Sequence, residues 1–197
     1  SGRAWPARVV SVGRSEVELE TGDPADELPR RGLRLTLAVA LPKGERQKWL
    51  VEKLTELGVE RLVPLVTERG VAEATPSAIE RLARSVIEAC KQCGRNRLMG
   101  IAPPATVAEV VMSKCPQTIG LLADPNGGAL DVATLPQMDS VVTLVGPEGG
   151  FTDAEMTTAR AAGFQAVTLA PHVLRIETAA IAMAAAWAVL MGSPPLR

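Results

Sequence analysis

The densest group of chemically distinctive residues surrounds Glu148, in the stretch LVGPEGGFTDAE at residues 144–155. Glycine lets a backbone approach a ligand closely, and proline fixes the direction of the chain. An apolar run precedes the stretch, and Thr152 and Glu155 follow at the spacing of a helix capping box. The pattern predicts a strand-to-helix corner that holds a ligand. The glycines and the proline that build it are Gly146, Pro147, Gly149 and Gly150.

Two further corners of this kind follow short apolar runs, LLADPNGG at 121–128 and LAPHVLRIETA at 169–179. In a parallel α/β sheet, ligands bind beyond the carboxyl ends of the strands. A tight turn would explain any one of these corners by itself. Three of them near one end of the chain predict a pocket.

The residues at these corners restrict the ligand. The sequence contains neither G-x-x-x-x-G-K-[ST] nor G-x-G-x-x-G, the two common phosphate-binding loops. A helix beginning after Phe151 would attract an anion, but Glu148 would repel a di- or triphosphate. A neutral or cationic ligand fits better, and an adenosine that carries a sulfonium is one candidate.

Alternating strands and helices are predicted to position the three corners. From Leu33 onward, short apolar runs alternate with amphipathic segments, which indicates an α/β fold with a mostly parallel sheet covered on both faces. Pro64 indicates an edge strand or an irregular ladder, and Ser77 with Glu80 indicates a capping box. The predicted strands are 33–41, 61–67, 118–124, 140–146 and 166–170, and the predicted helices are 45–58, 77–94, 106–114, 152–163 and 178–192.

The first 32 residues follow a different pattern. Residues 7–22 alternate apolar and polar positions around Gly13, which predicts a β-hairpin, and residues 22–32 read as a polar linker. We therefore expect an N-terminal β segment with its linker at 1–32 and the main domain at 33–197. The N-terminus lacks the apolar core of a signal peptide, and the longest apolar run, 179–191, is too short to span a bilayer.

Composition narrows the class of protein. The chain carries 21 basic and 22 acidic residues, so no overall field favours nucleic acid, although a local basic patch would suffice for binding. Three cysteines are an odd number and indicate a reducing compartment. Cys90 and Cys93 end a predicted helix, where the dipole disfavours a thiolate, and only Cys115 and His172 remain as further soft ligands. We expect a cytoplasmic protein without a metal site.

Four stretches together resemble the bacterial RsmE-type methyltransferases of the SPOUT superfamily. The resemblance extends over roughly residues 4–192, and it implies methylation of N3 of a uridine in 16S ribosomal RNA with S-adenosylmethionine. It also implies a C-terminal trefoil knot, a homodimer, and an N-terminal PUA-like β domain, of which residues 1–32 would be an incomplete part. The alternatives are a non-catalytic RNA-binding module of this fold and a SPOUT methyltransferase that acts on another RNA. The four stretches are LPKGERQKWLVEKLTELGVERLVPLVTERGV, KQCGRNRL, VGPEGGFTDAE and LAPHVLRIETAAIA.

The resemblance also implies roles for individual residues. Arg175 would hold the negative charge that develops on the uracil oxygens, although an ion pair with Glu177 or Glu148 is an alternative. Glu148 would accept the N3 proton or orient Arg175. Lys43, Arg69, Arg95 and Arg97 are predicted RNA-phosphate contacts. The predicted cofactor-binding residues are Leu122, Ala123, Val145, Gly146, Pro147, Gly149, Gly150, Leu169, Ala170, Val173, Leu174 and Thr178, the last of which is also a candidate helix N-cap.

Departures from the family pattern fall in the third corner. The family has a glycine where this chain has Ala170 and an arginine where it has His172. The alanine leaves less room for close backbone approach, and the histidine removes one fixed positive charge.

Overall fold

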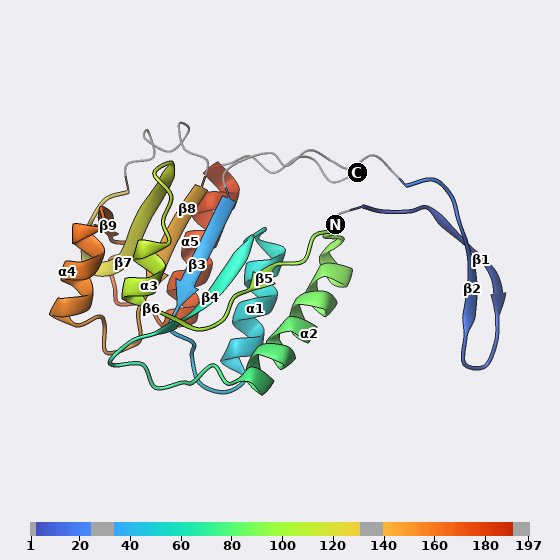
Figure 1. Cartoon of the computed structure of the whole chain (residues 1–197), viewed down its shortest axis with the longest axis horizontal. Coiled ribbons are helices and arrows are strands. Elements are labelled where there is room, and N and C mark those ends of the chain that lie inside the picture. Colours follow the sequence, from blue (N-terminus) through green and yellow to red (C-terminus); the bar gives the residue numbers. More distant parts are fainter. Residues whose placement is uncertain (1–2, 25–33, 131–139, 191–197) are drawn as a thin grey trace.

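A computed structural model describes residues 3–24, 34–130 and 140–190 of the chain. The main domain alternates strands with helices in chain order (Figure 1). The strands are β3 (Arg34–Val39), β4 (Arg61–Val66), β5 (Gly100–Ile101), β6 (Ala105–Thr106), β7 (Thr118–Gly128), β8 (Ser140–Val145) and β9 (Phe164–Val167). The helices are α1 (Arg46–Glu56), α2 (Pro76–Cys93), α3 (Val107–Met112), α4 (Asp153–Ala161) and α5 (Ile176–Leu190).

The strands form one sheet in the order β5-β4-β3-β8-β7-β9, with β6 also paired to β4. Every pair in this sheet is parallel. Strands β3 and β8 pair in register from Arg34 beside Ser140 to Val39 beside Val145. The predicted α/β class with a mostly parallel sheet is confirmed.

Helices cover both faces of the sheet, because side chains along each strand alternate between two cores. Leu37 and Val39 pack into the larger core beneath α1, α2 and α5, while Ala38 between them packs into the core beneath α3 and α4. In β7, Leu121 likewise packs into the larger core and Leu122 into the core beneath α3 and α4. Each fully buried leucine stabilises the fold by about 1.5–3 kcal/mol, so the alternation fixes the register of the central strands.

Several element boundaries differ from the predictions. Helix α2 is capped by Thr75, whose side chain accepts a hydrogen bond from the Ala78 N–H, and not by Ser77. Helix α5 begins at Ile176, so Thr178 lies inside the helix and is not its N-cap. The predicted end of this helix at 191–192 lies outside the described residues. The predicted capping box of Thr152 and Glu155 is confirmed, and Gly94 is the C-cap of α2.

The predicted irregularity at Pro64 is confirmed, and its cause is visible. Strand β4 pairs with β5 at Arg61 and Leu62, and with β6 at Leu65 and Val66. Pro64 lies between these two short ladders, at a point where no backbone donor is needed.

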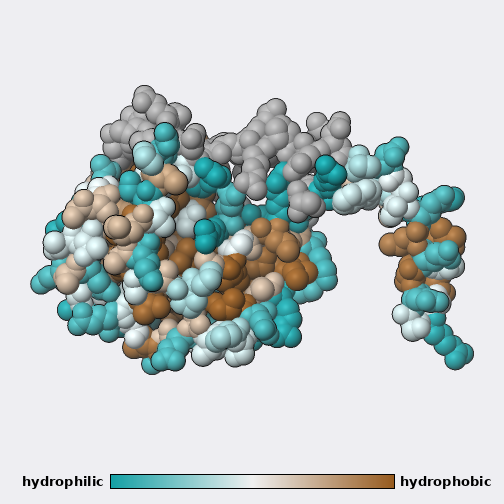
Figure 2. All heavy atoms as spheres, in the orientation of Figure 1, coloured by the Kyte–Doolittle hydropathy of each residue, from teal (hydrophilic) through white to brown (hydrophobic). Residues whose placement is uncertain are grey.

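The N-terminal hairpin is confirmed as β1 (Ala7–Val12) and β2 (Val17–Thr21), joined by a turn in which Gly13 N donates to Glu16 O at 2.8 Å. Every residue of both strands is exposed, and Figure 1 shows the pair standing apart from the main domain. Figure 2 shows apolar surface along it. Most of the predicted linker lies outside the described residues. Within the described ranges, no helix is long and apolar enough to cross a membrane.

Candidate functional site

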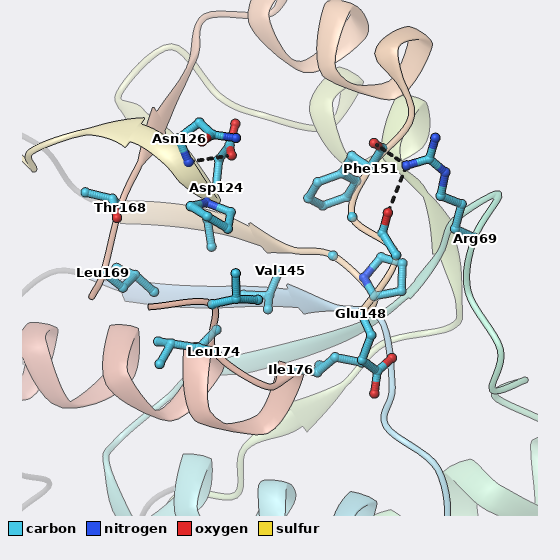
Figure 3. A pocket seen from close by; sticks show the side chains of 18 of the residues that line it. Arg69, Asp124, Asn126, Val145, Glu148, Phe151, Thr168, Leu169, Leu174 and Ile176 are labelled. Atoms are coloured by element: carbon cyan, nitrogen blue, oxygen red, sulfur yellow. Dashed lines mark hydrogen bonds between the residues drawn. The ribbon is translucent and has the colours of Figure 1, made fainter. Parts of the chain in front are cut away.

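The three predicted corners meet around one pocket of about 400 Å³ at the carboxyl edge of the sheet (Figure 3). They follow β7, β8 and β9, three neighbouring strands whose carboxyl ends lie side by side. The start of α5 closes the pocket with Ile176 and Ala179, and α4 contributes Asp153 and Met156. The volume lies within the range of small-molecule sites.

Most of the residues predicted to bind a cofactor line this pocket. Leu122 does not, because it is 1% exposed and packs in the core beneath α3 and α4. Thr178 is exposed on α5 and is also not part of the lining. Those that do line it are Ala123, Val145, Gly146, Pro147, Gly149, Gly150, Leu169, Ala170, Val173 and Leu174.

The two candidate catalytic residues occupy different positions. Glu148 is exposed and lines the pocket. Arg175 is exposed at the start of α5, where its backbone oxygen accepts a hydrogen bond from Ala179 N at 2.9 Å, and it is not part of the lining. Glu177, one of its two alternative ion-pair partners, is buried and instead pairs with Arg46 at 3.4 Å.

The glycine loop at residues 146–151 has a defined geometry. Gly150 has a φ of +70°, which favours glycine, and its N–H donates to Pro147 O at 2.9 Å, closing a turn. At Gly146, an added Cβ would lie 2.9 Å from the ring of Phe151. These two glycines therefore allow the turn to form and the Phe151 ring to close over the end of β8.

The first corner reaches the pocket through Asp124 and Asn126, which the site prediction did not include. Asn126 N donates to the Asp124 carboxylate at 2.9 Å, an Asx-turn contact for which the Asp-Pro-Asn sequence is the local signal. Beyond this bulge β7 pairs with β9 again. There an added Cβ on Gly127 would lie 2.5 Å from Val167 N.

The charges around the pocket match the predicted class of ligand. Three lining residues, Asp124, Glu148 and Asp153, carry carboxylates, while Arg69 is the arginine of the lining and His172 its histidine. An excess of carboxylates favours a neutral or cationic ligand over a polyphosphate.

The four predicted RNA contacts do not lie together. Lys43 and Arg69 follow the carboxyl ends of β3 and β4, at the edge that holds the pocket. Arg95 and Arg97 precede β5, which starts beside the first residue of β4, so they lie at the opposite edge. Arg95 donates to Thr55 O at 2.9 Å and to Val59 O at 2.7 Å, and burial lowers the pKa of its guanidinium.

The cysteines lie away from the pocket. Cys90 is buried, its thiol donates to Arg97 O at 3.7 Å, and burial raises its pKa, which favours the inert thiol. Across the three described ranges, no group of three or more His, Cys, Asp or Glu side chains is arranged to hold a metal ion.

Comparison with known proteins gives the class first. Residues 29–188 match the sequence model of the RNA methyltransferase domain. The SpoU methyltransferase AviRb of Streptomyces viridochromogenes has the same fold at 17% identity, with a TM-score of 0.52 over 88% of this chain and 67% of that one. The fold is therefore that of an RNA methyltransferase domain.

Closer relatives give the family. The chain is 38% identical over 186 residues to ribosomal RNA small subunit methyltransferase E of Synechocystis, covering 90% of this chain and 60% of that relative. It is 30% identical over 185 residues to the enzyme of the same name from Aquifex aeolicus, covering 92% and 80%. It belongs to the ribosomal RNA small subunit methyltransferase E family.

A solved member of this family supports the assignment. The structure of ribosomal RNA small subunit methyltransferase E from Neisseria gonorrhoeae, bound to S-adenosyl methionine, superimposes with a TM-score of 0.85 at 32% identity. The match covers 96% of this chain and 79% of that one.

Proposed function

We propose that this chain is an S-adenosylmethionine-dependent methyltransferase that modifies N3 of a uridine in 16S ribosomal RNA of the small subunit. The observation that carries the proposal is the pocket itself. Three loops from neighbouring strand ends, two of them rich in glycine, surround about 400 Å³ of space lined by three carboxylates. The solved relative from Neisseria gonorrhoeae binds S-adenosyl methionine.

The residues of the pocket fit this cofactor. Gly146 and Gly150 allow the tight turn of the loop, which leaves backbone groups near an adenosine, and Leu169 and Leu174 supply apolar contact. Asp124, Glu148 and Asp153 compensate the positive sulfur. When bound, the cofactor supplies an electrophilic methyl carbon.

The reaction also requires the uracil to lose its N3 proton, because the protonated nitrogen is a poor nucleophile. Glu148, exposed at the pocket, accepts this proton or orients Arg175. Arg175 stabilises the charge that spreads onto the ring oxygens. Its exposed position at the start of α5 leaves the side chain accessible to an incoming base.

We place the RNA at the carboxyl edge. Ala40 N donates to Val145 O at 2.9 Å, so the loop that carries Lys43 starts beside the strand that leads into the pocket. Lys43 is exposed and available to a phosphate. Contacts from Arg95 and Arg97 would require the RNA to extend to the opposite edge.

The larger assembly is part of the same proposal. It includes a SPOUT-type trefoil knot in the C-terminal strands, a homodimer, a PUA-like RNA-binding region to which residues 1–32 contribute, and a cytoplasmic site of action, where ribosomal RNA is found. The exposed apolar residues Val189 and Leu190 at the end of α5 support the homodimer.

The deciding experiment is methyl transfer. Small-subunit RNA from cells lacking this methylation is incubated with the protein and S-adenosylmethionine, and nucleosides are identified by mass spectrometry. We expect N3-methyluridine, and strongly reduced product with Glu148→Gln or Arg175→Met. Cofactor binding without transfer to any RNA would favour a non-catalytic RNA-binding module instead.

A further inference from the structure

A short turn at residues 67–70, immediately after β4, docks against the glycine loop of the pocket. Gly70 N donates to Thr67 O at 3.1 Å and closes this turn. Glu68 N donates to the Glu155 carboxylate at 3.1 Å, which connects the turn to the first residues of α4. The turn is therefore held in place independently of any ligand.

Arg69 extends from this turn to the backbone of the glycine loop (Figure 3). Its Nη1 donates to Gly149 O at 2.8 Å and to Phe151 O at 3.4 Å, the two carbonyls that flank Gly150. Its aliphatic stem covers Gly149, where an added Cβ would lie 3.4 Å from Arg69 Cβ and Cδ. In Figure 3 the Arg69 side chain lies on one side of the loop, and Leu169 and Leu174 lie on the other.

These contacts fix two peptide groups of the loop at both of their polar ends. The peptide between residues 149 and 150 has its carbonyl on Arg69 and its N–H on Pro147 O at 2.9 Å. The peptide between residues 151 and 152 has its carbonyl on Arg69 and its N–H on the Glu155 carboxylate at 2.8 Å. With both ends bonded, neither plane can rotate without losing a charge-assisted hydrogen bond.

From this geometry we propose that Arg69 is a positioning residue that preorganises the glycine loop for the cofactor. The inference rests on the proposed function for the identity of the ligand. Arg69 acts through the loop: it holds the backbone of Phe151, whose ring packs against Gly146 at the end of β8. An RNA phosphate would compete with two loop carbonyls for the same guanidinium nitrogen, so the phosphate contact predicted from the sequence is the alternative role.

Three variants separate the two roles. Arg69→Met removes the donors and keeps a long apolar stem, and Arg69→Lys keeps the charge and one donor. Lys43→Met is the matched control, because it removes an exposed charge at the same edge of the sheet. For each, we would measure the Kd for S-adenosylmethionine by calorimetry and the salt dependence of RNA binding. Amide exchange at Gly150 and Thr152 would be measured in the protein without cofactor.

For Arg69→Met we expect the cofactor Kd to rise about tenfold or more, because the loop carbonyls lose their hydrogen bonds to a charged group. Exchange at Gly150 and Thr152 should accelerate, and the salt slope of RNA binding should match that of the wild type. The cofactor Kd and the exchange rates of Arg69→Lys should lie between those of the wild type and those of Arg69→Met. Lys43→Met should lower the magnitude of the salt slope by about one unit and leave the cofactor Kd unchanged.

The proposal would be overturned if Arg69→Met left both the cofactor Kd and the amide exchange rates unchanged. If the salt slope of RNA binding also fell in that variant, Arg69 would be assigned to an RNA phosphate. If Arg69→Met does not fold, Arg69→Lys decides by the same readouts. If the wild type itself binds no S-adenosylmethionine, the proposed function fails, whereas the exchange rates still decide whether Arg69 holds the loop.

Discussion

Gly127 lies close to the backbone of β9 near the end of β7. A Cβ at this position would lie 2.5 Å from Val167 N and 2.6 Å from Val167 C, both backbone atoms that cannot move independently of the sheet. Gly127→Ala should therefore force the strand ends apart, lower the melting temperature by several degrees and weaken cofactor binding, because both strands end at the pocket.

The adjacent glycine provides the control for this prediction. A Cβ on Gly128 would meet nothing within 4 Å, so Gly128→Ala should have the melting temperature and the cofactor affinity of the wild type. Thermal unfolding and calorimetry on the two variants test the idea together. Equal behaviour of the pair would show that contact with β9 is not what requires glycine at Gly127.

At the residue scale, the sequence indicates the local backbone role of a glycine more readily than the contacts of a side chain with distant residues. Gly146 and Gly150 could be assigned to a ligand corner because glycine and proline act on their own stretch of backbone. The contact between Arg69 and Gly149 joins residues 80 positions apart and depends on the order of strands in the sheet. RNA binding by Arg69 stays a prediction, and its hydrogen bonds to the loop are contacts that the sequence does not indicate.

At the element scale, helix α2 provides a test of how helix starts are recognised. The structure places the cap at Thr75, with Pro76 at the first helical position, where proline is favoured. Thr75→Ala should reduce the free energy of unfolding by about 0.5–2 kcal/mol, and Ser77→Ala should change it by less than about 0.5 kcal/mol. Chemical denaturation measures both, and a larger loss for Ser77→Ala would contradict the assignment.

The period of apolar residues predicted every helix of the described domain and the central strands, because burial on one or two faces determines that pattern. Boundaries were less accurate where tertiary contacts set them. Strand β7 continues to Gly128, beyond the expected end at residue 124, because its last residue pairs again with Val167 of β9 after the bulge. The Asp-Pro-Asn sequence at Asp124 indicates a turn, but it does not indicate that pairing between β7 and β9 resumes after it.

At the scale of the whole molecule, the proposed homodimer predicts a mass near twice the 20.7 kDa of the chain in light scattering. Val189 on α5 is 80% exposed, and a charge placed in an apolar interface would be costly. Val189→Glu should therefore shift the protein toward the monomer.

The control for the dimer is Met112→Glu, since Met112 is similarly exposed, at 85%, but lies at the end of α3 on the other face of the sheet. It should leave the mass unchanged. A wild-type protein that is monomeric at micromolar concentration would contradict the homodimer.

Strand β3 lies between β4 and β8 in the sheet, and this position affects how the protein folds while it is being translated. Only helix α1 separates β3 from β4 along the chain. Strand β8, the other neighbour of β3, begins at Ser140, 106 residues after β3 begins at Arg34. At a translation rate of 5–20 residues per second, the backbone edge of β3 that pairs with β8 stays unpaired for roughly 5 to 20 seconds. An open strand edge is a template for pairing with other chains. We therefore expect the unpaired edge of β3 to be open to such pairing until β8 has been synthesised.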